Sequence, residues 1–280
     1  MPAAFIGHGS PMNTLQSNRF TEAWRAFGRS LPRPRAVLAI SAHWMLKGTA
    51  VTAMERPRVI HDFYGFPREL FEFDYPAPGA PDVAEEVADV LAPVQVGRDQ
   101  DSWGLDHGTW SVLAHVFPQA DIPVLQLSLH AEEDPEYHIE LGRRLAPLRE
   151  RGVFIFGSGN VVHNLRRMDR AWAEGGFDWA ERFDAEVLDV MTRRPGELAR
   201  VEALADFPLA APTPEHFLPL YYLAGLCEAA GEPAQAFIRG ATMGSLTMTS
   251  YVLGAPPQPS ADTGQAQGMP EGVPPEQTNI

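Results

Sequence analysis

The chain has 280 residues, a formal net charge of −14 and an isoelectric point of about 5.0. So acidic a chain is a poor partner for nucleic acid, and no apolar run approaches the roughly 20 residues that cross a membrane. Its single cysteine, Cys227, excludes an internal disulfide, and because the N-terminus has no secretory signal we expect a cytoplasmic protein.

A histidine follows the first predicted strand. The apolar stretch Ala3–Ile6 indicates a buried strand, and His8 comes next, between Gly7 and Gly9. Because glycine accepts backbone angles that other residues resist, a tight turn is predicted here. In open α/β folds, binding sites form at the carboxyl ends of strands, so His8 is a candidate site residue.

A second histidine follows a second apolar strand. Helical spacing of apolar residues predicts a helix over 18–31, which Pro34 helps to end. The continuous apolar run Ala36–Ile40 is typical of a central strand covered on both faces, and His43 follows it. Another strand is predicted over 49–54.

A third histidine precedes a helix in the middle of the chain. His107 lies between Asp106 and Gly108, directly before a helical pattern over 110–117. Asp106 can cap that helix. His115, within the pattern, is expected to be a packing or surface residue.

The remaining elements follow from apolar spacing. Helices are predicted over 82–91, 135–151, 179–193 and 196–204, and strands over 123–129, 235–239 and 246–252. Pro147 is expected to kink or end the helix over 135–151. His138, in the same helix, is expected to be solvated.

A fourth histidine follows the apolar strand Val153–Phe156. Gly157–Gly159 is expected to form a turn that leads into a helix and could cradle an anion. The turn has no Gly-Lys-Ser/Thr ending, so it is not a P-loop. Its informative feature is His163, which comes soon after the strand.

A fifth histidine lies near the start of a predicted helix that opens at Pro212 and reaches Ala230. Successive residues of a helix are about 100° apart, so Glu215 and His216 would not easily point at one ion.

These elements predict the α/β fold class, with one central, mixed, mostly parallel sheet flanked by helices. The predicted domain covers 1–254. From 255 to 280, Pro, Gly and Gln are frequent, which predicts a disordered tail.

Four of the histidines are expected to meet: His8, His43, His163 and His216. Parallel strands deliver their carboxyl ends to one edge of a sheet, and neutral imidazole is the commonest metal ligand. Two histidines with a carboxylate suit non-haem Fe(II), whereas three nitrogens suit catalytic zinc. Both arrangements remain open at this point.

Five motifs resemble those of the class III extradiol ring-cleavage dioxygenases, and within them the 4,5-DOPA dioxygenase branch. They occur in this order: Gly7–Met12, Ser41–Trp44, Gly104–Trp110, Gly157–Asn160 with His163–Leu165, and Pro212–Leu220. The resemblance implies a mononuclear metal site and insertion of O2 into the ring of a catechol, L-DOPA or a similar compound, to give a muconic semialdehyde.

The resemblance also implies the metal ligands. By position they are His8, His43 and His216, and Glu215 is the alternative to His216. The family's chemistry implies Fe(II) for activity, and divalent affinity trends make Zn(II) a second ion that the site would bind.

Two further residues receive roles from the resemblance. His163 matches a histidine that acts as the acid or base, or that ligates the metal in a resting form. His107 is implied to be catalytic, either by supporting the ligands or by contacting the substrate.

Two other functions use the same residues. A zinc-dependent hydrolase would activate water with them. A non-catalytic, Memo-like metal-binding protein would use the same architecture for interactions. For the dioxygenase, the expected partners are a small catecholic substrate and O2, with no nucleic acid and no membrane. The physiological catechol and the oligomeric state are not determined by the sequence.

Overall fold

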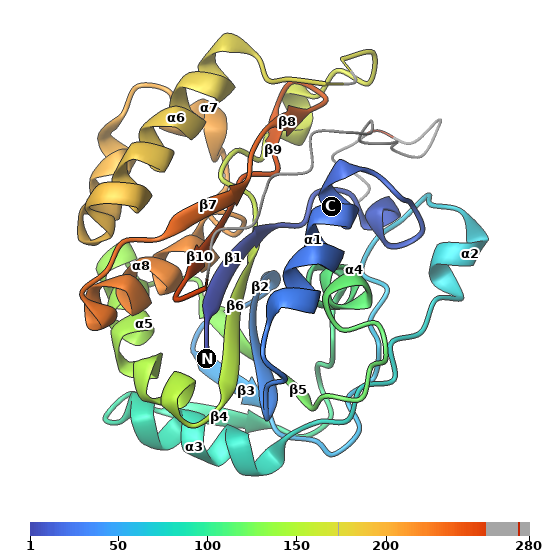
Figure 1. Cartoon of the computed structure of the whole chain (residues 1–280), viewed down its shortest axis with the longest axis vertical. Coiled ribbons are helices and arrows are strands. Elements are labelled where there is room, and N and C mark those ends of the chain that lie inside the picture. Colours follow the sequence, from blue (N-terminus) through green and yellow to red (C-terminus); the bar gives the residue numbers. More distant parts are fainter. Residues whose placement is uncertain (173, 256–273, 275–280) are drawn as a thin grey trace.

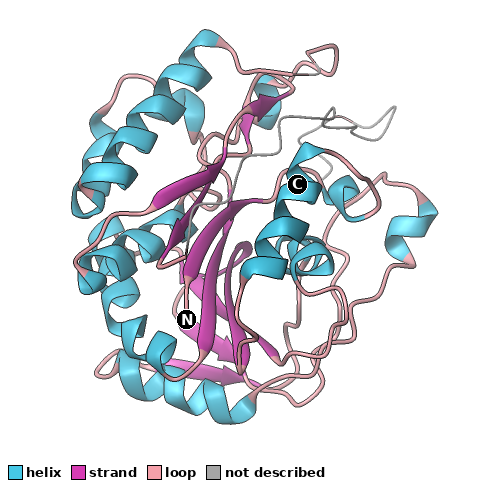
Figure 2. Ribbon diagram, viewed as in Figure 1, coloured by secondary structure: helices cyan, strands magenta, loops and turns pink. Residues whose placement is uncertain are grey.

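The computed structural model describes residues 1–172, 174–255 and 274. Its centre is an eight-stranded sheet of order β4-β3-β5-β2-β6-β1-β10-β7 (Figures 1 and 2). The strands are β1 (Ala3–Gly7), β2 (Ala36–Leu46), β3 (Thr49–Thr52), β4 (Val96–Asp99), β5 (Val124–His130), β6 (Val153–Gly159), β7 (Gln235–Ile238) and β10 (Ser250–Leu253). A separate pair is formed by β8 (Ala241–Thr242) and β9 (Leu246–Thr247).

The predicted mixed, mostly parallel sheet is confirmed. The inner strands β5, β2, β6 and β1 run parallel to one another, and β3 is parallel to β4. Antiparallel pairs occur toward the edges, between β3 and β5, β1 and β10, and β10 and β7. Gly7 pairs with Gly159 and Ser41 with Ser158, so the carboxyl ends of β1, β2 and β6 lie side by side.

Helices cover both faces of the sheet (Figure 2). One face carries α3 (Pro81–Leu91), α5 (Pro135–Glu150), α6 (Asp178–Arg193), η3 (Pro195–Ala203) and α8 (Leu218–Ala230). The other carries α1 (Arg19–Ser30), α2 (Arg68–Phe71) and α4 (His107–Val116). The short elements are η1 (Pro11–Thr14), η2 (Leu165–Arg167) and α7 (Phe207–Ala210). Because successive strand residues point to opposite faces, Phe5 joins the first core and Ile6 the second.

Two strands are longer than predicted. β2 continues to Leu46, with a register shift between Ile40 and Met45, so His43 lies within the strand and not after it. β6 includes Gly157–Gly159, so the predicted turn and helix start were wrong. The backbone of α8 and the turn before it approaches these glycines closely: a Cβ on Gly159 would lie 2.2 Å from the His216 carbonyl oxygen. The glycines therefore serve close packing in the strand.

Helix α5 differs from the prediction at two residues. It runs through Pro147 to Glu150, because buried Leu145 and Leu148 hold this turn in the core although a proline costs one helical hydrogen bond. His138 is fully buried and lies 3.2 Å from the Tyr222 hydroxyl, since it faces α8 and not solvent.

Three other expectations are refined. Residues 195–203 form a 3-10 helix, and α8 begins at Leu218, so Pro212 to Phe217 precede it as turns and bends. His115 is a packing residue, buried against the ring of Trp24 at a centroid distance of 5.7 Å.

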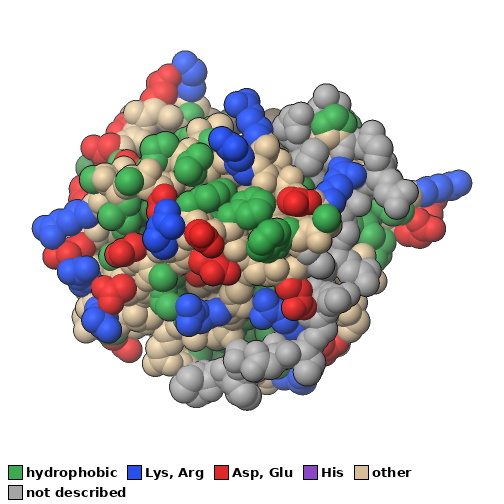
Figure 3. Space-filling view, turned by 90° about the horizontal axis from the view of Figure 1, so that it is seen from above, with side chains coloured by type: hydrophobic (Ala, Val, Ile, Leu, Met, Phe, Trp, Pro, Cys, Tyr) green, Lys and Arg blue, Asp and Glu red, His purple; other side chains and the backbone are tan. Residues whose placement is uncertain are grey.

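The predicted disordered tail, 255–280, lies outside the described residues except for Ala255 and Pro274, so both it and the domain boundary stay predictions. Among the described residues, no helix combines the length and apolar character needed to cross a membrane. On the face in Figure 3, basic and acidic side chains are interspersed.

A buried carboxyl group in α6 makes the stability of the fold depend on pH. Burial raises the pKa of Asp184 from 3.8 to about 6. Thr249 Oγ1 donates to one of its oxygens at 2.9 Å, and the other oxygen has no hydrogen-bond partner among the described residues. Since the folded pKa is above the unfolded one, the stabilisation is complete below pH 3.8 and is lost as the pH rises through 6.

We therefore expect Asp184→Asn to raise the free energy of unfolding by about 2 to 3 kcal/mol at pH 8, and by much less near pH 4. Urea denaturation of both proteins across this range measures the difference. A difference that does not change with pH would contradict the assignment.

Candidate active site

Five imidazoles meet at the carboxyl edge of the sheet. They come from the turn after β1 (His8), from β2 (His43), from the first residue of α4 (His107), from the segment after β6 (His163) and from the turn before α8 (His216). The ring centroids of His8, His43 and His216 are 5.1 to 5.4 Å apart. The structure thus brings together all the histidines to which site roles were assigned.

Ser158 determines which nitrogen of His8 carries the proton. The Ser158 hydroxyl donates to the Gly108 carbonyl, so its oxygen accepts a hydrogen bond from His8 Nδ1 at 2.9 Å. His8 Nε2 is therefore a lone-pair donor, and it lies 3.3 Å from His43 Nε2. Gly9, with φ of +60°, provides the turn predicted at this strand end.

One carboxylate orients two of the rings. Asp62 Oδ1 accepts from both the backbone N–H and Nδ1 of His107, at 3.0 and 2.9 Å, and Asp62 Oδ2 lies 3.3 Å from His43 Nδ1. Burial alone would raise the pKa of Asp62, but His107, His43 and the hydrogen bonds from His107 hold it below its usual range. The carboxylate stays ionised and accepts from His107 Nδ1, while its Oδ2 lies close to His43 Nδ1.

His216 is oriented by the residue before it in the chain. Glu215 Oε1 lies 3.3 Å from His216 Nδ1 and accepts a hydrogen bond from the Thr213 hydroxyl at 2.7 Å. The predicted separation of about 100° does not apply, because both residues precede α8. Ligand atoms of His163, Glu215 and His216 lie within 4.8 Å of one another.

His163 lies face to face with His216. The ring centroids are 3.4 Å apart and the planes differ by 4°. The nitrogen lone pairs of two stacked rings lie in two parallel planes, so they cannot point at one atom. An ion in the plane of His216, at the usual distance of about 2.0 to 2.1 Å, would therefore lie too far from the plane of His163 to be its ligand as well.

The chemistry of this donor set fits a divalent cation. Burial, followed by the neighbouring imidazoles, lowers the pKa of His8 and His216 well below the usual value, and that of His43 to about 3. All three rings are therefore neutral at pH 7. His107 Nε2 and His216 Nε2 are buried without a hydrogen-bond partner in the described structure. A bound cation would satisfy such lone pairs, which otherwise cost about 1 to 3 kcal/mol each.

The cluster opens into a cavity of about 590 Å³. His43, His163, His216 and Glu215 line it, whereas His8 and His107 are buried and are not among its lining residues. Of the two ways in which His107 was expected to act, support of the ligands through Asp62 fits this position better than contact with a substrate.

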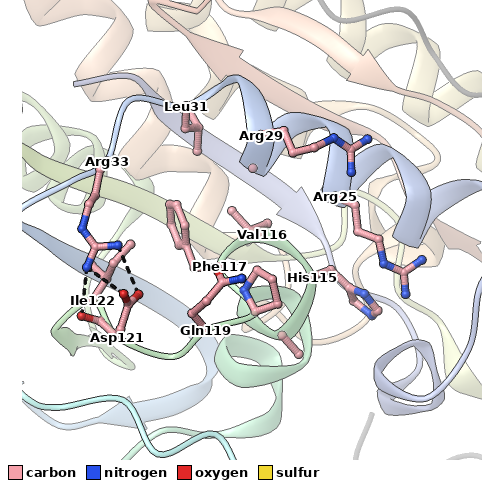
Figure 4. Close-up of a pocket in the computed structure, with 13 residues that line it drawn as sticks. Arg25, Arg29, Leu31, Arg33, His115, Val116, Phe117, Gln119, Asp121 and Ile122 are labelled. Carbon is pink, nitrogen blue, oxygen red and sulfur yellow. Dashed lines mark hydrogen bonds and ion pairs between the residues drawn. The ribbon is translucent and has the colours of Figure 1, made fainter.

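A second hollow, of about 460 Å³, lies between α1 and the end of α4 (Figure 4). Arg25, Arg29 and His115 are among the residues that line it, and Arg33 pairs with Asp121 at its edge at 3.0 Å. None of the five clustered imidazoles lines this hollow, so the chemistry belongs to the larger cavity.

Sequence reasoning missed Asp62 and Ser158. Asp62 lies in an aromatic loop, 45 residues before His107. It accepts hydrogen bonds from both the backbone N–H and the ring of His107. Ser158 lies between two glycines of a strand that pairs with β1. A polar residue flanked by glycines in a buried strand was the available signal for Ser158. No local pattern identified Asp62.

Fold and site together define an α/β protein with a histidine-rich cavity at the carboxyl edge of its sheet. Residues 3–253 match the family described as the catalytic LigB subunit of aromatic ring-opening dioxygenase. The chain belongs to this family and is therefore a dioxygenase of the extradiol ring-cleavage class, as the sequence motifs predicted.

Individual relatives agree with the family. A 4,5-DOPA dioxygenase extradiol of Escherichia coli (strain K12) is 45% identical over 258 residues, covering 91% of this chain and 95% of the relative. One from Beta vulgaris is 39% identical, covering 83% and 88%. A crystal structure of an uncharacterised protein from Escherichia coli K12 superposes with a TM-score of 0.80 at 41% identity, covering 91% of this chain and all of that one.

The position of Asp62 between two rings predicts the effect of its replacement. In Asp62→Asn, one oxygen of the carboxylate becomes an N–H donor and the negative charge beside both Nδ1 atoms is lost, so the hydrogen bond from His107 or the contact with His43 is lost. We expect the affinity for Zn(II) to fall about 10- to 100-fold, as for other groups that orient metal-bound histidines. Competition with a chelator measures this affinity.

The exposed Asp101→Asn variant is the matched control for the loss of one negative charge. Equal zinc affinity in the Asp62→Asn, Asp101→Asn and unsubstituted proteins would contradict the role of Asp62.

Proposed function

We propose that the protein is a metal-dependent extradiol dioxygenase that inserts O2 into the ring of a catechol, L-DOPA or a similar compound, and releases a muconic semialdehyde. The observation that carries the proposal is the set of buried, neutral imidazoles whose Nδ1 atoms are held by fixed acceptors beside an open cavity. The relatives named 4,5-DOPA dioxygenase extradiol support the substrate class. A cavity of about 590 Å³ has room for a single-ring substrate.

His8, His43 and His216 are the proposed metal ligands. Each has its Nδ1 beside an oxygen acceptor, so each offers Nε2 to the ion. Fe(II) is the proposed ion for activity, and Zn(II) would also bind such nitrogens. When bound by these residues, Fe(II) would supply electron transfer between the catechol and O2.

Glu215 supports His216 and does not replace it in this proposal. Its Oε1 lies beside His216 Nδ1 and is also hydrogen-bonded by Thr213. The carboxylate is therefore used in orienting the ring, while the unpartnered His216 Nε2 is left for the ion.

His163 is the proposed acid and base. Its stacking on His216 argues against simultaneous ligation, and it lines the cavity where a substrate would lie. A neutral imidazole can take a proton from a catechol hydroxyl and return it later in the reaction. His107 acts as a positioning residue, because Asp62 accepts a hydrogen bond from His107 Nδ1 and its other oxygen lies 3.3 Å from His43 Nδ1.

Oxygen consumption tests the function. We expect Fe(II)-loaded protein to take up O2 with L-DOPA or another catechol. His8→Ala, His43→Ala and His216→Ala should each lose metal and at least 100-fold of the activity, because a ligand is removed. His130→Ala, outside the cluster, is the control and should keep both.

Failure to consume O2 across a panel of catechols would reject the proposal. Activity that is equal with and without O2 would favour the zinc hydrolase.

The role of His163 has its own test. We expect His163→Ala to keep its metal, because this ring is not a ligand, and to lose about 10²- to 10⁴-fold in turnover, the usual contribution of acid–base catalysis. Metal analysis and O2 uptake on the same sample measure the two effects. Full turnover with bound metal would contradict the role.

A further inference from the structure

The active-site cavity contains one arginine beside the site residues. Its remaining walls are largely apolar, from Ala42, Met45, Leu165 and Pro212. Arg166 is the only basic side chain apart from histidine among the described residues that line it. A ligand of this cavity therefore meets apolar surface, imidazoles, the Glu215 carboxylate beside His216 and one guanidinium.

Arg166 has no acidic partner within the described part of the chain, although the protein carries 36 acidic and 22 basic residues. Many arginines elsewhere are paired, as Arg143 is with three glutamates and Arg182 is with Asp206. Arg166 is exposed to solvent. An unpaired guanidinium that lines a cavity is available to an anionic ligand.

The backbone that carries Arg166 is held firmly relative to the catalytic histidine. Asn164, between them, donates from its side chain to the Leu209 carbonyl at 2.8 Å and from its backbone to Ser245 at 3.1 Å. The Ser245 hydroxyl donates back to the Asn164 carbonyl at 2.8 Å. Arg166 therefore starts from a defined position three residues after His163.

We propose that Arg166 binds a carboxylate on the ring substituent of the substrate, so that the site prefers catechols with an acidic side chain. This rests on the proposed dioxygenase function. The two hydroxyl groups face the imidazoles, the ring lies against the apolar wall, and the substituent reaches the guanidinium. A guanidinium pairs with a carboxylate through two parallel hydrogen bonds, which a neutral or cationic substituent cannot make.

Two pairs of catechols isolate the carboxylate. L-DOPA and dopamine differ only by this group, as do 3,4-dihydroxyphenylacetate and 4-methylcatechol. We expect kcat/KM to be about two- to fivefold higher for the acid in each pair, which is the usual effect of an ion pair exposed to solvent.

Arg166→Gln should bring both ratios close to one, mainly by raising KM for the acids. Arg167→Gln removes the same charge from the same short helix, but Arg167 does not line the cavity. Arg167→Gln is therefore the matched control, and it should keep the same kcat/KM ratios of acid to partner as the unsubstituted protein. Arg166→Lys should restore part of the preference, because an ammonium keeps the charge but loses the paired hydrogen bonds.

Binding provides a readout that does not need turnover. Under anaerobic conditions, calorimetry on Zn(II)-loaded protein should give tighter binding of 3,4-dihydroxyphenylacetate than of 4-methylcatechol. The difference should disappear in Arg166→Gln and remain in Arg167→Gln.

The outcomes separate the two proposals. One outcome is that catechols are consumed with no difference in kcat/KM between acids and their partners, or with a difference that Arg166→Gln retains. In either case the inference about Arg166 is wrong and the dioxygenase function stands. If no catechol is consumed and neither acid binds better than its partner, both are wrong. If the acids bind through Arg166 without O2 uptake, only the dioxygenase reaction is rejected.

Discussion

The site depends on holding several imidazoles close together inside the protein although their Nε2 lone pairs are not satisfied by hydrogen bonds. His8 Nε2 and His43 Nε2 lie 3.3 Å apart, and the Nε2 atoms of His107 and His216 are buried without hydrogen-bond partners in the part of the chain that the structure describes. A buried unsatisfied polar atom costs about 1 to 3 kcal/mol. The surrounding packing and the oxygen atoms beside Nδ1 hold each ring in place despite this cost. A bound cation would remove the cost by accepting the lone pairs.

The orienting groups come from distant parts of the chain. Ser158 belongs to the central strand β6, Asp62 to the loop after β3, and Glu215 to the turn before α8. Each has an oxygen beside an Nδ1 atom of the cluster. Loss of Ser158 or Glu215 would leave one ring without its oxygen neighbour, and loss of Asp62 would leave two.

Close backbone packing makes this convergence possible. A Cβ on Gly108 would lie 2.7 Å from Ser41 Oγ and 2.9 Å from the His43 ring. A side chain at this position would separate α4 from β2, and with it His107 from His43. The glycine beside His107 is therefore a requirement of packing between two elements that both carry site residues.

The sequence by itself determined most strands and helices, because apolar periodicity and caps are local properties, but it did not predict β4, and the strand predicted over 246–252 is divided into β9 and β10. Ala3–Gly7 and Arg19–Ser30 occur as predicted, within one or two residues. The sequence motifs also identified the family and all five histidines that the structure brings together.

Only the tertiary structure decided how those histidines are held. Asp62 lies beside the rings of His107 and His43, which are distant from it in the chain. His138 is buried because α8, a distant segment of the chain, packs against its helix. Gly157–Gly159 extend a strand because neighbouring strands pair with them. These features depend on contacts between segments distant in the sequence. A periodic pattern specifies which face of an element is apolar, but the partner of that face exists only once the chain has folded.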